Sequence, residues 1–244
     1  MNKFQKCLVT GGAGFIGSNL VKHLIRENFQ VTVIDNLSSG NLDNIKPFSK
    51  DINFIKADIS KNGKWNKEFK GKDVIFHLAA LADIVPSINY PEKYFHSNVS
   101  GTLNVLESAK KFNVNRILYS ASSSCYGIPS KYPTSEKSLI QPKYPYAFTK
   151  YYAELMLMHW SKVYKLNINS LRLFNVYGPN SRTSGTYGAM FGVFLAQKIN
   201  KKPFTVVGNG KQKRDFVHVD DVCNAFLSVM KFGKKNNIYN VGSG

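Results

Sequence analysis

A glycine-rich turn near the N-terminus constrains the fold of this chain more than any other feature. Residues 5–10 predict a short buried strand, and Gly11, Gly14 and Gly17 follow it directly. Beyond them, apolar residues recur at helical spacing through residue 25. A strand, a glycine turn and a helix place the free amides of the helix N-terminus where they can bind a diphosphate. The glycines are spaced three and three, unlike the G-x-G-x-x-G pattern of long-chain dehydrogenases.

The alternation of strands and helices continues along most of the chain. Further strands are expected at 31–34, 52–55, 73–77, 115–120 and 166–173, and long helices at 92–112 and 146–164. This alternation predicts an α/β fold with a Rossmann-type doubly wound parallel sheet, so we expect residues 1–177 to form an NAD-binding domain. From residue 178 the pattern changes to a polar loop, a helix at 189–200, a strand at 203–207, a helix at 220–231 and a strand at 237–241. We interpret residues 178–244 as a small substrate lobe interleaved with the end of the sheet.

Composition excludes several classes of protein. The 244 residues are 43% hydrophobic and 20% charged, as in ordinary globular domains. No apolar run approaches the ~18 residues of a membrane span, and the first residues show no signal-peptide pattern. Cys7, Cys125 and Cys223 fit no metal-ligand spacing. We therefore expect a cytoplasmic protein that has no metal site and does not interact with membranes.

The positive charge of the chain is a separate question. A net charge of +18, from 33 basic and 15 acidic residues, would attract polyanions. The lysines are scattered, however, and no nucleic-acid-binding module is recognisable. We expect no nucleic-acid partner, and we interpret the field as one that helps to draw in a small anionic ligand.

Residues at the strand ends extend the expected cofactor site. Asp35 follows the strand 31–34, about 20 residues beyond the glycines. Alone it could be a turn residue, but with the glycines a carboxylate here is expected to accept hydrogen bonds from an adenosine ribose, which favours NAD over NADP. Asp58 is placed to meet the adenine ring. The residues expected to contact NAD are Gly11, Gly14, Phe15, Ile16, Gly17, Asp35, Asn36, Asp58, Ile59, Leu78, Ala79, Ala80, Asn98, Tyr146 and Lys150.

Tyr146 and Lys150 are four residues apart in an expected helix, so they share one face. This spacing arises by chance in many helices. The chemical interpretation is that the ammonium lowers the pKa of the phenol from about 10, so that the phenolate can take a proton from a substrate hydroxyl. The expected cofactor site favours this interpretation. His77, at the end of the strand 73–77, could be a general base, but a satisfied core histidine is the favoured interpretation.

Six segments of the chain carry a resemblance to a known family. They are Gly11-Gly-Ala-Gly-Phe-Ile-Gly17, Asp35, Ala121-Ser122, Tyr146-x-x-x-Lys150, Arg172-Leu-Phe-Asn-Val-Tyr-Gly-Pro179 and Arg214-Asp-Phe-Val-His-Val-Asp-Asp221. In this order and spacing they resemble the extended short-chain dehydrogenase/reductase family, and more narrowly its nucleotide-sugar epimerase and dehydratase branch. The resemblance covers almost the whole chain.

The resemblance implies roles for individual residues. Tyr146 would be the acid/base, Lys150 would bind the nicotinamide ribose, and Ser122 would hydrogen-bond the reacting sugar oxygen. Asn175 and Arg214 would hold the nucleotide diphosphate, although Arg214 could instead pair with Asp215 on the surface. The candidates for binding the substrate are Ser87, Ser122, Ser123, Ser124, Asn175, Arg182 and Arg214.

The implied reaction is transient oxidation of a nucleotide sugar at its 4-hydroxyl by NAD, followed by reduction from the other face. Ser123 and Ser124 occupy positions where dehydratases and decarboxylating members carry acidic residues, which favours a UDP-sugar 4-epimerase. The alternatives are a 4,6-dehydratase or reductase of the same family, and a non-catalytic NAD-binding regulatory or scaffold protein. The resemblance also implies a homodimer formed through the helices 92–112 and 146–164. Members of the family continue beyond the segment that matches residues 240–244, so we expect the substrate lobe to be incomplete.

Overall fold

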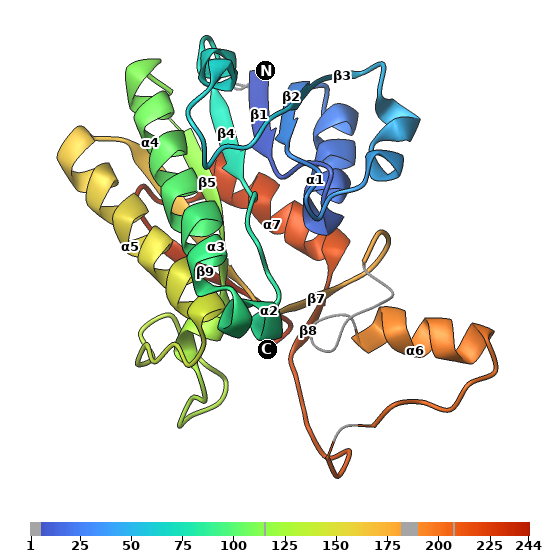
Figure 1. Cartoon of the computed structure of the whole chain (residues 1–244). Helices are drawn as coiled ribbons and strands as arrows, with labels where there is room; N and C mark the ends of the chain where they lie inside the picture. Colours follow the sequence, from blue (N-terminus) through green and yellow to red (C-terminus); the bar gives the residue numbers. More distant parts are fainter. Residues whose placement is uncertain (1–5, 115, 182–189, 207) are drawn as a thin grey trace.

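A seven-stranded parallel sheet forms the centre of the molecule (Figure 1). The computed structural model describes residues 6–114, 116–181, 190–206 and 208–244. The strand order is β3-β2-β1-β4-β5-β6-β9, and every neighbouring pair is parallel. The strands are β1 (Lys6–Thr10), β2 (Gln30–Asp35), β3 (Ile52–Lys56), β4 (Val74–His77), β5 (Arg116–Ser122), β6 (Asn167–Leu173) and β9 (Ile238–Val241). The strand order reverses between β1 and β4, as the expected Rossmann-type fold requires.

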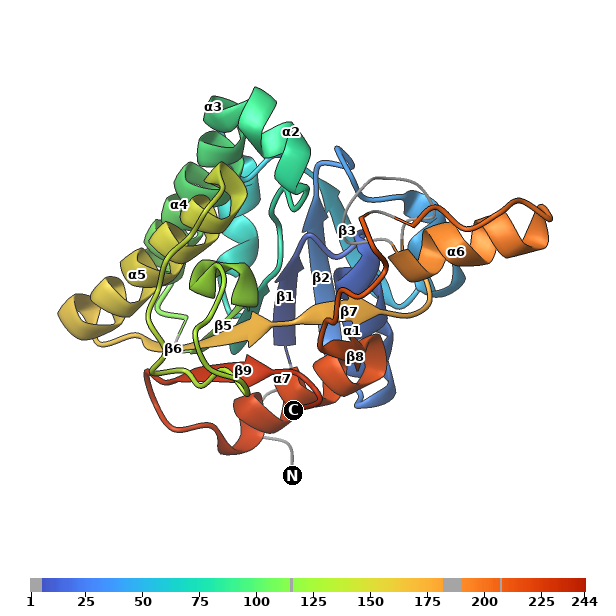
Figure 2. The same ribbon diagram turned by 90° about the horizontal axis from the view of Figure 1, so that it is seen from below.

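Helices cover both faces of this sheet (Figures 1 and 2). The helices are α1 (Phe15–Arg26), α2 (Ile84–Asn89), α3 (Pro91–Phe95), α4 (Gly101–Lys111), α5 (Pro145–Tyr164), α6 (Met190–Ile199) and α7 (Val219–Phe232). On one face, Leu20 and Leu24 of α1 pack in the same core as Phe226 of α7. On the other face, α4 and α5 bury side chains that include Leu106 and Leu157. The central strands are therefore covered on both sides, which explains why they are continuous apolar runs in the sequence.

The structure corrects three details of the expected elements. The helix predicted at 92–112 is divided into α3 and α4 by a π-helical turn, His96–Ser100. Residues 203–206 form no strand, because they are exposed and have no partner strand. A second, two-stranded sheet of β7 (Asn175–Tyr177) and β8 (Phe216–His218) was not predicted. Strands of three residues are too short to show a period of two.

The segment after residue 178 contributes a strand to the seven-stranded sheet and a strand to the two-stranded sheet. Its helix α7 packs on α1, and its strand β9 pairs with β6 at the edge of the large sheet. The helix α6 projects from the rest of the chain beside β7 and β8 (Figure 1). The ring of Phe191 lies between Tyr177 and Phe216, with 4.8 Å between ring centroids in each contact. Within the described ranges, the chain has no helix with the length and apolar character needed to cross a bilayer.

Candidate active site

The glycine turn after β1 is tight enough to exclude side chains. Gly11 has a φ of +74°, and a Cβ atom there would lie 2.6 Å from the backbone nitrogen of Ala79. A Cβ at Gly17 would overlap the carbonyl oxygen of Gly11. The turn therefore brings the start of α1 against β1 and β4, and the first amides of a helix have no partner within the helix. The N-terminus of α1 is thus shaped to receive an anionic group such as a diphosphate.

A cavity of about 560 Å³ lies at the carboxyl ends of the strands, where the strand order reverses. Of the residues predicted to bind the cofactor, those that line the cavity are Gly11, Gly14, Phe15, Ile16, Gly17, Asp35, Asn36, Asp58, Ile59, Leu78, Ala79 and Ala80. Lining residues that the sequence analysis missed are Ile34, Ser38, Ser39, Asn41, Asn44, Ala57, Ala82, Asp83, Ser97, Ser120, Asn180 and Ser181. Many of these are small polar residues in the loop after β2 and beyond Pro179, and that polar clustering was the available signal.

Asp35 is fixed at the wall of this cavity. Its Oδ2 accepts a hydrogen bond of 2.9 Å from the amide of Ala13, and its Oδ1 accepts one of 2.8 Å from the amide of Leu37. Burial raises the pKa of Asp35, whereas these two backbone hydrogen bonds lower it. Each carboxylate oxygen has a further lone pair, so the group can still accept from a ribose hydroxyl. The tight glycine turn and this oriented carboxylate both fit a dinucleotide.

A second carboxylate, that of Asp58, lies elsewhere on the cavity wall. Burial works to raise the pKa of Asp58, but hydrogen bonds from Ser60 and Asn36 outweigh it, and the pKa is lowered. The amide and the hydroxyl of Ser60 both donate to Asp58 Oδ1, at 2.9 Å and 2.7 Å. The carboxylate is thus held in its ionised, accepting form.

Asn98 is buried and does not line the cavity, which corrects the expectation that it contacts the cofactor. Its side-chain oxygen accepts from the amide of Leu81 at 2.8 Å, and its side-chain nitrogen donates to the carbonyl of Leu81 and the hydroxyl of Thr149, both at 3.0 Å. The side chain is buried and its hydrogen-bonding groups are occupied by protein. Asn98 therefore joins the loop after β4 to the helix α5.

Ser122, Tyr146 and Lys150 meet where β5 ends against the first turns of α5. The hydroxyl of Ser122 hydrogen-bonds Tyr146 and also lies 2.8 Å from the hydroxyl of Ser124. Tyr146 keeps part of its surface accessible, whereas Lys150 is 4% exposed. The ammonium of Lys150 lies over the ring of Tyr119, 4.3 Å from its centroid. Ser122 and Tyr146 are therefore neighbours in space, and Lys150 follows Tyr146 one turn later on α5. Ser120, two residues before Ser122 on β5, lines the cavity.

The protonation of Tyr146 and Lys150 depends mainly on their burial. Burial raises the pKa of Tyr146, while the hydrogen bond from Ser122 lowers it and the charge of Asp83 raises it further. Burial also lowers the pKa of Lys150 to about 7, although the charge of Glu154 opposes this. At the pH at which a phenol begins to ionise, a lysine with this pKa is mostly neutral. In this structure burial has the largest effect on the pKa of both groups, and the role expected for Lys150 in lowering the pKa of Tyr146 stays a prediction.

His77 is a core histidine, as the favoured interpretation predicted. Thr102 donates its hydroxyl proton to the carbonyl of Asn98 at 2.6 Å, so it accepts from His77 Nε2 at 2.8 Å. His77 Nδ1 then accepts from the hydroxyl of Thr10 at 2.7 Å. The ring is fully buried, and burial together with the charge of Lys150 lowers the pKa of His77 to about 3. A histidine with both nitrogens occupied has no free position for a substrate proton.

Among the predicted substrate-binding residues, Ser123 and Ser124 are partly exposed beside Ser122. Ser87 is a correction, because its side chain is fully buried and its hydroxyl donates to the carbonyl of Ile84 at 2.5 Å. Asn175 donates its side-chain amide to the carbonyl of Asp215 at 2.9 Å, which ties β7 to β8. Arg182 lies outside the described residues.

Arg214 is exposed, and its guanidinium donates to the carbonyl of Lys213 at 2.8 Å. The carboxylate of Asp215 accepts instead from the amide and the hydroxyl of Ser243, each at 2.8 Å. The position of Arg214 on the surface is therefore open to an anionic ligand. In the part of the chain that the structure describes, no three His, Cys, Asp or Glu side chains gather in a way that could hold a metal ion.

Comparison with known proteins places this geometry in context. The model of the NAD dependent epimerase/dehydratase family matches residues 7–242. The UDP-glucose 4-epimerase of Mycolicibacterium smegmatis is 36% identical over 245 residues, which cover 98% of this chain and 78% of that protein.

Solved structures of members of this family have the same fold. The UDP-N-acetylglucosamine 4-epimerase of Methanobrevibacter ruminantium, in complex with UDP-N-acetylmuramic acid, superposes with a TM-score of 0.94 at 34% identity, over 99% of this chain and 77% of that one. A dTDP-glucose 4,6-dehydratase of Streptomyces venezuelae with NAD bound superposes with a TM-score of 0.92 at 30% identity, over 98% of this chain and 76% of that one. Epimerases and dehydratases thus share this arrangement of strands and helices.

Proposed function

Because the chain belongs to the NAD-dependent epimerase/dehydratase family, we propose that it is a UDP-sugar 4-epimerase that uses NAD. The observation that carries the proposal is the cluster of Ser122, Tyr146 and Lys150 beside the cavity. Two of the relatives and structures most similar to this chain are named as 4-epimerases of UDP-sugars. A regulatory or scaffold protein that only binds NAD has no use for this acid/base cluster.

Different residues of the chain have different roles in the proposed reaction. The start of α1 and Asp35 would hold the diphosphate and the adenosine ribose of NAD. When bound, NAD supplies a hydride acceptor that later returns the hydride to the sugar. Tyr146 takes the proton of the 4-hydroxyl and gives it back, and Ser122 orients the same oxygen. Lys150, whose pKa is about 7, can exchange a proton at working pH.

Epimerisation needs no further acid or base, which fits the residues next to Ser122. The hydroxyls of Ser123 and Ser124 do not titrate near neutral pH, so they cannot supply the additional proton transfers of an elimination. A dehydratase is the second candidate, and one observation favours it. Asp83 lines the cavity, and its charge acts on Tyr146, so a carboxylate is present near the reaction centre. The product formed from a nucleotide sugar distinguishes an epimerase from a dehydratase.

The decisive experiment is to incubate the purified protein with NAD and a panel of UDP-, TDP-, GDP- and CDP-sugars, and to identify the products by NMR. We expect a C4-inverted UDP-sugar with no net reduction of NAD. Tyr146→Phe should abolish conversion while NAD still binds, whereas Tyr144→Phe, an exposed tyrosine two residues earlier, should leave the rate unchanged. A 4-keto-6-deoxy product would establish the dehydratase instead, and conversion by Tyr146→Phe would exclude Tyr146 as the base.

We also propose that the protein is a homodimer. Several apolar side chains of α3, α4 and α5 remain exposed, and they include Phe95, Leu103, Phe148, Tyr152 and Leu155. The rings of Phe148 and Tyr152 stack at 6.0 Å, and Phe95 adjoins Tyr152 at 6.3 Å. A contiguous apolar face of this kind is typical of a protein–protein interface. Its match to the helices named by the family resemblance supports a twofold pairing of α4 and α5 with a second copy.

We propose that residues 1–177 bind NAD and that residues 178–244 contribute the substrate lobe, because Arg214 and the sheet of β7 and β8 lie in or border this segment. We also propose a reducing compartment, the cytoplasm, because Cys7, Cys125 and Cys223 are all free and buried.

A further inference from the structure

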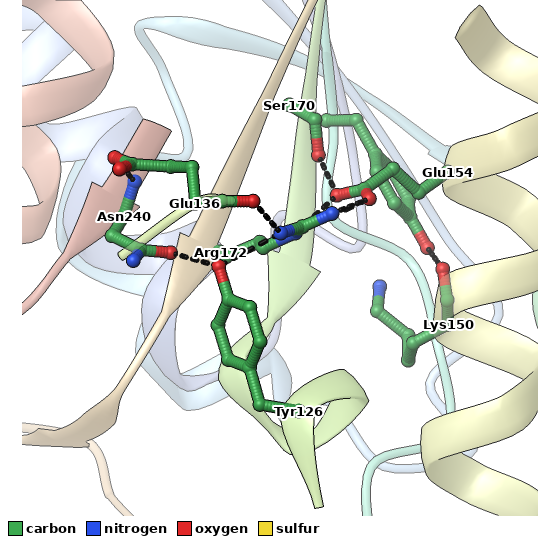
Figure 3. A network of polar contacts seen from close by, with 8 residues as sticks. Tyr126, Glu136, Lys150, Glu154, Ser170, Arg172 and Asn240 are labelled. Carbon is green, nitrogen blue, oxygen red and sulfur yellow. Dashed lines mark hydrogen bonds and ion pairs between the residues drawn. The ribbon is translucent and has the colours of Figure 1, made fainter. Parts of the chain in front are cut away.

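A buried ion pair joins α5 to β6, away from the groups that contact substrate or cofactor (Figure 3). Arg172 Nη2 donates to Glu154 Oε1 at 2.6 Å, and Arg172 Nε lies 3.1 Å from Oε2. The hydroxyl of Ser170 donates to Oε2 at 2.6 Å. The side chains of Arg172 and Glu154 are only 4% and 2% exposed. The carboxylate of Glu154 is thus held in one orientation from two sides.

The network extends from Arg172 to the end of the sheet. Arg172 Nη1 donates to the hydroxyl of Tyr126 at 2.7 Å and to the carbonyl of Glu136 at 3.2 Å. The hydroxyl of Tyr126 in turn donates to Asn240 Oδ1 at 2.7 Å. Arg172 therefore has partners on both sides of its guanidinium, and it cannot turn away from Glu154 without breaking several hydrogen bonds.

A buried pair of this kind needs a reason beyond stability. Removing two charges from water costs several kcal/mol per ion, and well-packed apolar residues of similar volume often stabilise a fold equally well. The position of Glu154 on α5 suggests the reason. Glu154 lies four residues after Lys150, so the two side chains share a face of the helix. Figure 3 shows both projecting from α5 towards the sheet.

Lys150 is buried among groups that could change its charge. Tyr119 of β5 lies under the ammonium, and His77 of β4, which is neutral, is close enough to feel its charge. Tyr146 shares its helix one turn earlier. The charged side chains of α4 are Glu107, Lys110 and Lys111: the first two are partly exposed and pair with each other, and Lys111 is exposed.

Charges also lie on the other elements that pack against α5. Glu92 and Lys93 of α3 are exposed. Arg172 of β6 bonds to Glu154. Glu154 is the group whose negative charge acts on Lys150.

We propose that Glu154 is a positioning residue for Lys150: clamped by Arg172 and Ser170, its carboxylate supplies the counter-charge that keeps the buried lysine able to carry an ammonium. The inference rests on the proposed function only in that Lys150 serves the reaction. Its direct consequence is that the Lys150 ammonium becomes less stable when the charge of Glu154 is removed. The balance between a phenol with a neutral lysine and a phenolate with an ammonium then moves towards the neutral pair.

The test compares variants that remove this charge with variants that keep it. Glu154→Gln removes the negative charge alone, but it leaves Arg172 buried without its partner and can prevent folding. The double substitution Glu154→Leu with Arg172→Met, which removes both charges of the pair, is therefore measured beside it. Glu154→Asp keeps the charge. The matched control is Glu27→Leu with Lys231→Met, which removes a surface ion pair of 2.8 Å between α1 and α7. Folding is verified for each variant by circular dichroism and urea unfolding.

The first readout is the pKa of the Lys150 ammonium, followed by NMR of protein carrying 13C- and 15N-labelled lysine and assigned with Lys150→Met. In the folded double variant we expect this pKa to fall by about one unit or more. Glu154→Asp and the surface control should keep the wild-type value. An unchanged pKa in every folded variant that lacks the charge of Glu154 overturns the inference, since the pair would then be structural only.

The second readout is the pH dependence of epimerisation with the UDP-sugar identified by the panel. We expect the plateau of kcat to fall about tenfold, and the acid limb of its pH profile to move down by about one unit. The affinity for NAD should change less than twofold. A double variant with the wild-type pH profile contradicts the inference. If the wild-type protein epimerises no sugar, the proposed function fails, and the NMR titration still decides the role of Glu154.

Discussion

The ammonium of Lys150 lies over the face of the Tyr119 ring, 4.3 Å from its centroid. The same tyrosine donates its hydroxyl to the carbonyl of Lys150 at 3.3 Å, so β5 holds this residue at both its side chain and its backbone. A cation over an aromatic face is stabilised by about 0.5–1 kcal/mol when exposed, and by about 2 kcal/mol when desolvated. Tyr119 therefore favours the charged form of Lys150 against its burial.

This contact predicts different results for two substitutions at Tyr119. Tyr119→Leu removes the ring, so we expect kcat to fall about five- to tenfold and the free energy of unfolding to fall by about 2–3 kcal/mol. Tyr119→Phe keeps the ring and loses one hydroxyl, so kcat should stay within about twofold and stability should fall by about 1 kcal/mol. Urea unfolding and steady-state kinetics measure both. Equal kcat values for the two variants would show that the ring does not act on Lys150.

His77 predicts that the protein loses stability in mild acid. Its pKa is lowered to about 3 from an ordinary value of 6.5, so between these values the unfolded chain binds a proton that the folded protein does not. The free energy of unfolding should therefore fall as the pH drops below 6.5, by about 2 kcal/mol at pH 5. The stabilisation is fully present above pH 6.5.

Other groups also titrate in this range, so the test is a difference between variants. His77→Gln should have a flatter dependence of unfolding free energy on pH between 7.5 and 5 than the wild type. His159→Gln, at an exposed position on α5, should follow the wild-type curve. If His77→Gln and the wild type run parallel across this range, His77 is not responsible for the acid sensitivity.

The order of strands and helices could be predicted from sequence because its signals are local. A strand that is buried on both faces must be an apolar run, and the turn after β1 needs glycine wherever a Cβ would meet backbone. The residues that line the cofactor cavity follow from these strand ends. The paired strands β7 and β8 did not follow, because each is held by a partner strand 41 residues away in the sequence (Asn175 opposite Phe216) and is too short to show a period of two.

The chemistry of the site was less predictable than its location. The spacing of Tyr146 and Lys150 places both on one face of a helix, but it does not predict how deeply the two side chains are buried. Burial decides the direction of both pKa shifts, and the packing of α5 on β5 contributes to it. The burial of Ser87 likewise depends on α2, which has no periodic signal in the sequence.

Asp35 predicts that one substitution changes the choice of cofactor. Asp35→Asn keeps a hydrogen-bond acceptor for Ala13 or Leu37 but removes the negative charge. We expect the Kd for NAD to rise about tenfold, because hydrogen bonds to charged groups contribute about 1.5–3 kcal/mol. The Kd for NADP should stay the same or fall, because the repulsion of the 2'-phosphate is lost.

Isothermal titration calorimetry with both cofactors measures this ratio. Asp43→Asn is the matched control and should leave both Kd values unchanged, because Asp43, unlike its neighbour Asn44 in the 3-10 turn Leu42–Asn44, does not line the cavity. An Asp35→Asn protein with the wild-type preference for NAD over NADP would remove Asp35 from the cofactor site.

The exposed apolar face of α4 and α5 gives the last prediction. Tyr152 stands at its centre, between Phe95 and Phe148. A carboxylate buried in an apolar interface without a partner is costly, so Tyr152→Glu should convert the dimer to a monomer at micromolar concentration. Sedimentation velocity measures the change in mass directly.

The control for this experiment is an exposed apolar side chain on another element. Phe232, at the end of α7, is 83% exposed and lies away from α4 and α5, so Phe232→Glu should leave the mass unchanged. The substituted position in Tyr152→Glu is itself exposed in the single chain, and urea unfolding of the monomer should therefore remain close to that of the control. A Tyr152→Glu protein that still sediments as a dimer would mean that the two copies pair through a different surface, or that this apolar face serves another partner.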